Sequence, residues 1–188
     1  MSFSTLPLCV DLDETLVLKD TFTSSILRML KREPWLALPF AFHFLKGGRP
    51  AAKTWIAGIY PVDPARLAYR TELVDYLRSE KAKGRKIYLV SAASQDTVER
   101  IQKHLNLFDA VHGSSGRTNL KGAHKADFIL KNIAEKFAYA GDSFADLAVW
   151  DKAEAAIVCG PKAGLIRARL RPAVEAEFGP GLPASRGA

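Results

Sequence analysis

The sequence has few cysteines and no long uninterrupted hydrophobic run. Its two cysteines, Cys9 and Cys159, are too few for a disulfide framework and favour a reducing compartment. Two cysteines and four scattered histidines also give no zinc-binding pattern. The longest apolar run, residues 35–45, is interrupted by Pro39 and His43 and falls short of the ~20 residues that a membrane span needs. The first eight residues lack the charged start and apolar core of a signal peptide, so a cytoplasmic protein is expected.

The composition is that of a folded protein with locally concentrated positive charge. Hydrophobic residues make up 48% of the 188 residues, which is enough for one core and excludes disorder as the main state. The net charge is +7, and residues 18–60 hold seven basic but only two acidic side chains. Residues 161–188 hold five basic and two acidic ones. Neither cluster contains a nucleic-acid recognition motif, so nucleic acid is not expected as a partner.

Short apolar segments alternate with helical patterns along most of the chain. Strands are expected at 6–12, 86–90, 110–113, 137–140 and 155–159, and helices at 63–83, 94–107, 123–136 and 145–153. This alternation predicts an α/β fold, a Rossmann-like parallel sheet with helices on both faces. Residues 18–61 are instead helical and aromatic, and we expect a small all-helical cap there, inserted into a core of residues 1–17 and 62–178. Residues 179–188 are expected to be a flexible tail.

Polar side chains follow three of the expected strands. Asp11 and Asp13 come after the first strand, Ser91 follows the strand at 86–90, and Asp142 and Asp146 follow the strand at 137–140. Because open parallel sheets bind ligands beyond the carboxyl ends of their strands, these side chains are expected to converge. Carboxylates at one site can bind a cation that prefers oxygen ligands, such as Mg²⁺. Carboxylates, a hydroxyl and a cation together suit phosphoryl transfer.

Two lysines complete the pattern, and the whole pattern resembles a known family. Lys121 and Lys125 lie near an expected helix start and could offset phosphoryl charge. The segments 8–17, 87–94, 119–127 and 137–147 resemble, in order and spacing, the four motifs of the haloacid dehalogenase superfamily. The insertion at 18–61 resembles that superfamily's helical cap. The resemblance implies a Mg²⁺-dependent phosphomonoester hydrolase that forms an aspartyl-phosphate intermediate.

The resemblance also implies a role for each site residue. Asp11 would be the nucleophile, and Asp13 would be the general acid for the leaving group and then the base for water. Ser91 would hydrogen-bond the phosphoryl oxygens. Mg²⁺ would be held by Asp11, the main-chain carbonyl of Asp13, and Asp142. Asp146 would support these ligands or bind the metal through water.

The motif lysine has two candidates, and the residue after Asp13 departs from the usual pattern. Lys125 resembles the motif lysine of phosphoserine phosphatases, whereas Lys121 has a more usual separation from Asp142. Both are retained as catalytic candidates, with a slight preference for Lys125. Glu14 stands where small-molecule phosphatases of the superfamily usually carry glycine.

The expected cap leaves two interpretations of the substrate open. Asp20 lies where phosphoserine phosphatases carry an acidic substrate contact, but it could equally cap the first cap helix. The cap's aromatic residues either pack the cap or contact the membrane interface from its inner face, helped by the surrounding lysines and arginines. These aromatic residues are Trp35, Phe40, Phe42, Phe44, Trp55 and Tyr60.

A narrower resemblance concerns residues 115–122 and 139–150. They resemble the phosphatase domain often fused ahead of UbiA-type prenyltransferases, which implies a polyprenyl-phosphoryl-linked sugar phosphate as substrate and a prenyltransferase as partner. One alternative is a phosphoserine-phosphatase-like enzyme for a small soluble phosphomonoester. Another is a non-catalytic module that binds phosphorylated lipid or a membrane prenyltransferase.

Overall fold

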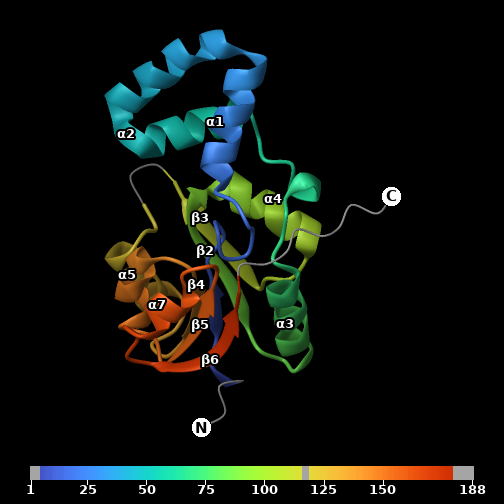
Figure 1. The fold of residues 1–188 in the computed structure, drawn as a ribbon, viewed down its shortest axis with the longest axis vertical. Coiled ribbons are helices and arrows are strands. Elements are labelled where there is room, and N and C mark those ends of the chain that lie inside the picture. Colours follow the sequence, from blue (N-terminus) through green and yellow to red (C-terminus); the bar gives the residue numbers. More distant parts are fainter. Residues whose placement is uncertain (1–4, 116–118, 180–188) are drawn as a thin grey trace.

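The computed structural model describes residues 5–115 and 119–179 and contains a six-stranded parallel sheet surrounded by helices (Figure 1). The expected Rossmann-like α/β fold is therefore confirmed. In sheet order the strands are β3 (Ala110–Ser114), β2 (Ile87–Ser94), β1 (Leu8–Val10), β4 (Ala138–Gly141), β5 (Ala155–Cys159) and β6 (Ala173–Phe178). The helices are α1 (Thr21–Arg32), α2 (Ala37–Ile59), α3 (Thr71–Ala82), α4 (Gln95–Leu105), α5 (Ala123–Asn132), α6 (Leu147–Trp150) and α7 (Ala163–Arg167).

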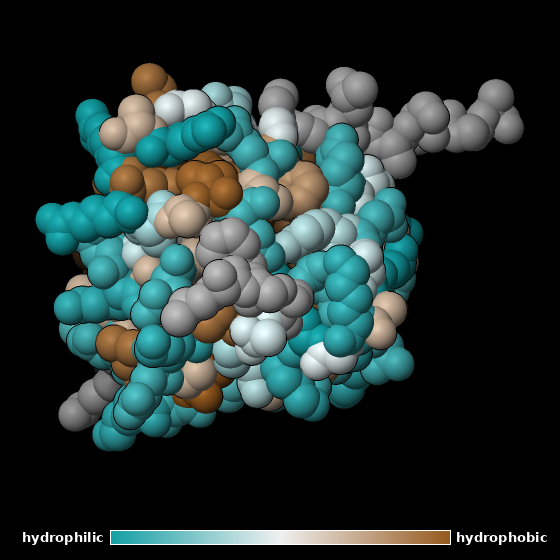
Figure 2. Space-filling view, turned by 90° about the horizontal axis from the view of Figure 1, so that it is seen from below, coloured by the Kyte–Doolittle hydropathy of each residue, from teal (hydrophilic) through white to brown (hydrophobic). Residues whose placement is uncertain are grey.

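Helices α1 and α2, with a short 3₁₀ turn at Pro34–Leu36 between them, form a separate helical lobe, residues 21–59. In Figure 1 the lobe stands above the carboxyl ends of the strands. A small apolar core holds it together, in which Phe40 packs against Phe22 and Trp55 with ring centroids 6.2 Å apart in each pair. Helix α2 is kinked at Gly48, whose φ is 66°. The opposite end of the molecule is mostly hydrophilic, with smaller hydrophobic areas (Figure 2).

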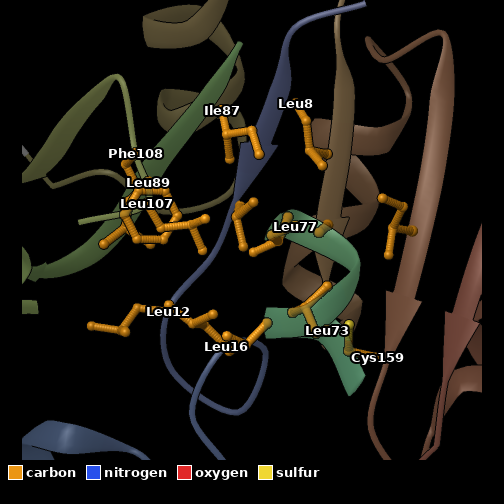
Figure 3. Packing of buried hydrophobic residues seen from close by; sticks show 14 of the residues in the cluster. Leu8, Leu12, Leu16, Leu73, Leu77, Ile87, Leu89, Leu107, Phe108 and Cys159 are labelled. Atoms are coloured by element: carbon orange, nitrogen blue, oxygen red, sulfur yellow. The ribbon is translucent and has the colours of Figure 1, made fainter. Parts of the chain in front are cut away.

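Helices cover both faces of the sheet, so the central strands are apolar throughout. In β1, Leu8 and Val10 face the cluster formed with α3 and α4, whereas Cys9 faces the cluster formed with α5, α6 and α7. Figure 3 shows the first of these clusters, where Leu73 and Leu77 of α3 lie among the side chains of the strands. Strands buried on both faces are near-continuous apolar runs, as β1 and β5 are here.

The strand order places a ligand crevice beside β1. The chain runs outward from β1 through β2 to β3, then returns to β4 on the other side of β1 and continues to β5 and β6. Strands β1 and β4 are neighbours, with Val10 paired to Ala140. The chain continues from β1 to β2 and from β4 to β5, so it leaves these two strands towards opposite halves of the sheet. At such a switch point the connections diverge beyond the carboxyl ends of the strands and leave room for a ligand.

Several elements differ from the sequence expectation. Helix α3 begins at Thr71 rather than near Asp63, because Asp63 caps a 3₁₀ turn at Pro64–Arg66 and the chain is extended at Leu67. Strand β6 was not expected, since glutamates interrupt its apolar residues. One of them, Glu175, pairs with the buried Arg85. The expected tail lies outside the described residues except for Gly179.

Candidate active site

A cavity of about 270 Å³ lies at the switch point, between the sheet and the helical lobe. The lobe contributes Arg49 and Lys53 from the second half of α2. All eight residues singled out from the sequence line this cavity: Asp11, Asp13, Asp20, Ser91, Lys121, Lys125, Asp142 and Asp146. The structure therefore brings together side chains that follow β1 and β4, a side chain within β2, which runs on to Ser94 instead of ending before Ser91, and side chains of a helix and the lobe.

Asp11 and Lys125 form an ion pair in this cavity, in which the Lys125 side chain is buried and the Asp11 side chain is partly exposed. Lys125 lies in the first turn of α5, and its Nζ is 2.9 Å from Asp11 Oδ1. The Leu12 N–H donates to the same oxygen at 2.8 Å. Burial alone would lower the pKa of the Lys125 ammonium, but Asp11 and Asp146 outweigh burial, and the pKa is raised. The lysine therefore stays charged at neutral pH, where it can orient the carboxylate and offset the charge of a bound anion.

Asp13 has the protonation behaviour of a general acid or base. Its Oδ1 accepts a hydrogen bond of 2.7 Å from the N–H of Thr21, the first residue of α1. Burial, with smaller contributions from Asp20 and Asp11, raises the pKa of Asp13 to about 6, although the Thr21 N–H opposes the shift. A carboxyl group with this pKa can exchange a proton near neutral pH.

The acidic side chains at the ends of β1 and β4 fit a divalent cation. Asp11, Asp142 and Asp146 each present an oxygen within 4.8 Å of the other two. Burial, reinforced by Asp146 and Asp11, raises the pKa of Asp142 to about 7. Lys125 offsets only part of the negative charge of these three carboxylates. Mg²⁺ can offset the rest, because it favours carboxylate oxygens as ligands. The Asp13 side chain is outside this group, and the ligand expected there is its main-chain carbonyl.

Asp146 is held in place by its own neighbours. Its Oδ1 accepts from the Tyr139 hydroxyl at 2.8 Å, and that hydroxyl accepts from Lys125 Nζ at 2.7 Å. The Ser143 N–H and hydroxyl donate to Oδ2 at 3.1 and 2.7 Å. A Cβ at Gly141 would lie 2.8 Å from the Tyr139 ring and 3.0 Å from Asp146 Cγ, so this packing requires glycine. Tyr139 could not be identified from the sequence, where it resembles an ordinary strand residue.

Arg70 holds the loop after Asp13 in place, a role that could not be identified from the sequence. Its guanidinium is buried and donates to the carbonyls of Glu14 at 2.8 Å and Thr15 at 3.0 Å, and also to the Gly179 carbonyl. Glu14 has a φ of 59°, which explains why glycine suits this position. The Thr15 hydroxyl donates to Asp142 Oδ1 at 2.9 Å, so this loop is joined to the acidic group.

The remaining candidates differ in their surroundings. Ser91 is buried where the pairing of β2 with β3 becomes irregular, and its Oγ accepts from the Ala93 N–H at 3.1 Å. Lys121 is exposed at the cavity wall. Asp20 is the N-cap of α1 and accepts from the Thr23 N–H at 2.6 Å, while also lining the cavity.

Two substitutions separate the capping role of Asp20 from a substrate contact. Asp20→Ala should lower the free energy of unfolding by about 1 kcal/mol, whereas Asp20→Asn should change it little, because asparagine also caps helices. We expect the KM for the substrate of this cavity to be unchanged in Asp20→Asn. Denaturant unfolding and initial-rate kinetics measure the two effects. A rise in KM with unchanged stability in Asp20→Asn would instead make Asp20 a substrate contact.

Without a metal ion, the protein should become more stable as the pH falls from about 8 to about 6. The folded-state pKa values of Asp13 and Asp142, about 6 and about 7, lie above those of unfolded aspartates, so the folded state binds these protons more tightly. Asp142 alone should add about 1–2 kcal/mol to the free energy of unfolding over this range. Urea unfolding with a chelator present measures the effect. Greater stability at the higher pH would show that burial and the neighbouring carboxylates do not raise the pKa values of Asp13 and Asp142 as described.

Comparison with known proteins identifies the family of most of the chain. Residues 8–150 match the model of the haloacid dehalogenase-like hydrolases. The chain is 39% identical over 155 residues to the uncharacterized protein y4nM of Sinorhizobium fredii (strain NBRC 101917 / NGR234). That match covers 82% of this chain but 30% of the relative, so the chain spans about a third of the length of the curated relative it matches.

Solved structures share the fold at low sequence identity. A haloacid dehalogenase family hydrolase from Salmonella enterica serovar Typhi has a TM-score of 0.62 and 18% identity, over 89% of this chain and 67% of its own. A protein of unknown function from Bordetella pertussis has a TM-score of 0.64 and 17% identity, over 89% and 96%. A phosphoserine phosphatase has a TM-score of 0.60 and 14% identity, over 93% of both chains.

Proposed function

The chain belongs to the haloacid dehalogenase-like hydrolases, and we propose that it hydrolyses phosphomonoesters with Mg²⁺ through an aspartyl-phosphate at Asp11. The observation that carries this proposal is the contact between Asp11 and Lys125 beside the acidic group of Asp142 and Asp146, within one cavity. A carboxylate nucleophile must approach an anionic phosphoryl group, so it needs neighbouring positive charge. Lys125 supplies part of that charge, and the acidic group can bind a cation that supplies the rest.

In the first step, a carboxylate oxygen of Asp11 attacks phosphorus. A bond forms between that oxygen and phosphorus while the bond from phosphorus to the substrate oxygen breaks. Asp13 gives its proton to the departing oxygen, which leaves as an alcohol. The raised pKa of Asp13, about 6, supports this role because part of the population is protonated near neutral pH.

In the second step, water attacks the phosphorus of the aspartyl-phosphate. Asp13, now ionised, takes a proton from the water, and the bond from phosphorus to Asp11 breaks. Phosphate leaves, and both carboxyl groups return to their starting states. The hydrogen bond from the Thr21 N–H holds Asp13 in one orientation for both proton transfers.

The other residues of the cavity bind and orient the reacting groups. Asp11, Asp142 and the main-chain carbonyl of Asp13 would hold Mg²⁺, with Asp146 positioned beside them by Tyr139. When bound, Mg²⁺ supplies positive charge that stabilises the phosphoryl oxygens. The Ser91 hydroxyl would donate to a phosphoryl oxygen.

The lobe side of the cavity favours a substrate with a second anionic group. Arg49 and Lys53 line it, and Lys121 adds a third cation that is not needed for the ion pair with Asp11. A polyprenyl-phosphoryl-linked sugar phosphate carries such a group in its phosphodiester, and we propose this substrate class. Phosphoserine offers a carboxylate instead and is the alternative. Part of the segment that suggested the lipid-linked substrate, residues 116–118, lies outside the described residues.

Phosphate release tests both the reaction and the substrate class. Release would be measured with and without Mg²⁺ from phosphoserine, other soluble phosphomonoesters, and a polyprenyl-phosphoryl pentose phosphate in detergent, with Asp11→Asn as the blank. We expect Mg²⁺-dependent release, fastest from the lipid-linked substrate. Faster release from phosphoserine would retain the reaction but replace the proposed substrate. Release no faster than the blank from every substrate would leave a binding module as the better account.

A further inference from the structure

Hydrophobic side chains are exposed mainly on the helical lobe. Of the ten large hydrophobic side chains that are exposed in the described residues, eight belong to it. Four form an apolar ridge, defined here as Trp35, Leu38, Phe42 and Leu45, which are 65%, 80%, 60% and 85% exposed. A contiguous set of exposed hydrophobic side chains is unusual for a surface that faces only water.

The ridge occupies one side of a helix whose other side is already buried. Its positions are three, four and three residues apart, which places them on the same side of the first half of α2 and of the turn before it. On the other side, Phe40 packs into the lobe core. A helix that is hydrophobic on both sides normally has a nonaqueous environment on both. The ridge therefore requires an apolar partner.

Basic side chains flank the ridge and indicate the charge of that partner. Lys31 and Arg32 end α1 just before Trp35, and Lys46 follows Leu45. The Lys46 ammonium lies 5.7 Å from the centre of the Phe42 ring. Pairing of two ridges between copies of this chain would bring these like charges together. A surface that is both apolar and negatively charged would complement them.

We propose that the apolar ridge and its flanking cations bind the surface of an anionic lipid bilayer. Trp35 and Phe42 would enter the headgroup layer, Leu38 and Leu45 the acyl boundary, and the basic side chains would contact lipid phosphates. No helix in the described part of the chain is long and apolar enough to cross a membrane.

The position of the ridge suits this contact. The lobe forms one end of the molecule in Figure 1, and the opposite end, seen in Figure 2, is mostly hydrophilic. The second half of α2 contributes Arg49 and Lys53 to the cavity wall, so one helix carries both the ridge and part of the cavity. This surface is independent of the proposed reaction, because no ridge residue lines the cavity.

Vesicle binding by the full chain tests the proposal. Cosedimentation would compare phosphatidylcholine vesicles with vesicles that also contain phosphatidylglycerol. The test variant is Leu38→Ser/Phe42→Ser/Leu45→Ser, and the matched control is Leu165→Ser, whose leucine is 66% exposed on α7. We expect binding to the anionic vesicles that weakens with salt, a loss of at least about tenfold in the test variant, and no change in the control.

Tryptophan fluorescence gives a second readout, which needs only one conservative substitution at an exposed residue. Trp35 is exposed, whereas Trp150 is fully buried and Trp55 packs against Phe40 in the lobe core, so a blue shift on vesicle binding should be absent in Trp35→Phe. The proposal is wrong if the wild-type protein does not bind anionic vesicles, or if the ridge variant binds them as tightly as the wild type does. It is also wrong if analytical ultracentrifugation shows a dimer that the ridge variant abolishes, since the ridge would then join two copies. Hydrolysis of a soluble phosphomonoester should be equal in all these proteins, which separates this result from failure of the proposed reaction.

Discussion

Asp11→Asn is expected to reduce Mg²⁺-dependent phosphate release to background. The amide cannot act as the nucleophile, and it removes one of the three carboxylates that fit a divalent cation. The fold should survive, because asparagine has the size of aspartate and can still accept from the Leu12 N–H. Lys125 keeps a carboxylate partner in Asp146, whose Oδ1 is 3.8 Å away. Phosphate release and thermal unfolding of the same preparation measure the two effects.

Asp75→Asn is a matched control for this variant. It makes the same chemical change at an exposed residue of α3 that pairs with the neighbouring Arg78. The control should retain wild-type activity and stability. Turnover by Asp11→Asn well above background would remove Asp11 from the nucleophile role. An unfolded Asp11→Asn protein would show that the ion pair with Lys125 is needed for folding, and Lys125→Met should then unfold too.

Lys125→Met should lower kcat by about 10²–10³-fold, whereas Lys121→Met should lower it by less than about tenfold. Lys125 is buried and contacts Asp11 directly, but Lys121 is exposed at the cavity wall. The loss at Lys125 should appear mainly in kcat, because its charge is applied at the oxygen proposed to react. Lys121 should act mainly on KM, since it is exposed at the cavity wall, where it can attract an anionic substrate.

Steady-state kinetics of the two variants, at saturating Mg²⁺, decide between the lysines. Circular dichroism must accompany them, because removing Lys125 leaves the neighbouring carboxylates unopposed. Lowering the pH or adding Mg²⁺ should restore any stability that Lys125→Met loses. The larger kcat effect at Lys121 would contradict the assignment and favour the lysine with the more usual spacing in sequence.

The convergence of the acidic residues could be predicted from the sequence because it depends on local pattern. Asp11, Asp13 and Asp142 follow apolar strands, and parallel strands place their carboxyl ends at one edge of the sheet. The contacts that hold them could not be predicted in this way. Arg70 reaches the loop at Glu14 across more than fifty residues of chain, and no local periodicity marks a buried arginine. Strand β6 could not be predicted because Glu175 and Glu177 interrupt the apolar run that marks a buried strand.

The arrangement of the aromatic residues in the lobe could also be predicted only in part. Their sequence pattern allowed either internal packing or contact with a membrane, and the structure separates them into two sets. Phe40 and Trp55 pack together in the lobe core, whereas Trp35 and Phe42 are mostly exposed. A helix with hydrophobic residues on both sides has no clear polar face, so its periodicity alone could not tell which side packs inward.

Chemical trapping of the intermediate tests the central claim most directly. Wild-type protein would be mixed with Mg²⁺ and a phosphomonoester and quenched with borohydride, which reduces an aspartyl-phosphate to homoserine. Peptide mass spectrometry would then locate the modified residue. We expect homoserine at position 11, only when both substrate and Mg²⁺ are present. Phosphate release without this modification, or modification at another aspartate, would contradict the assignment of Asp11 as the nucleophile.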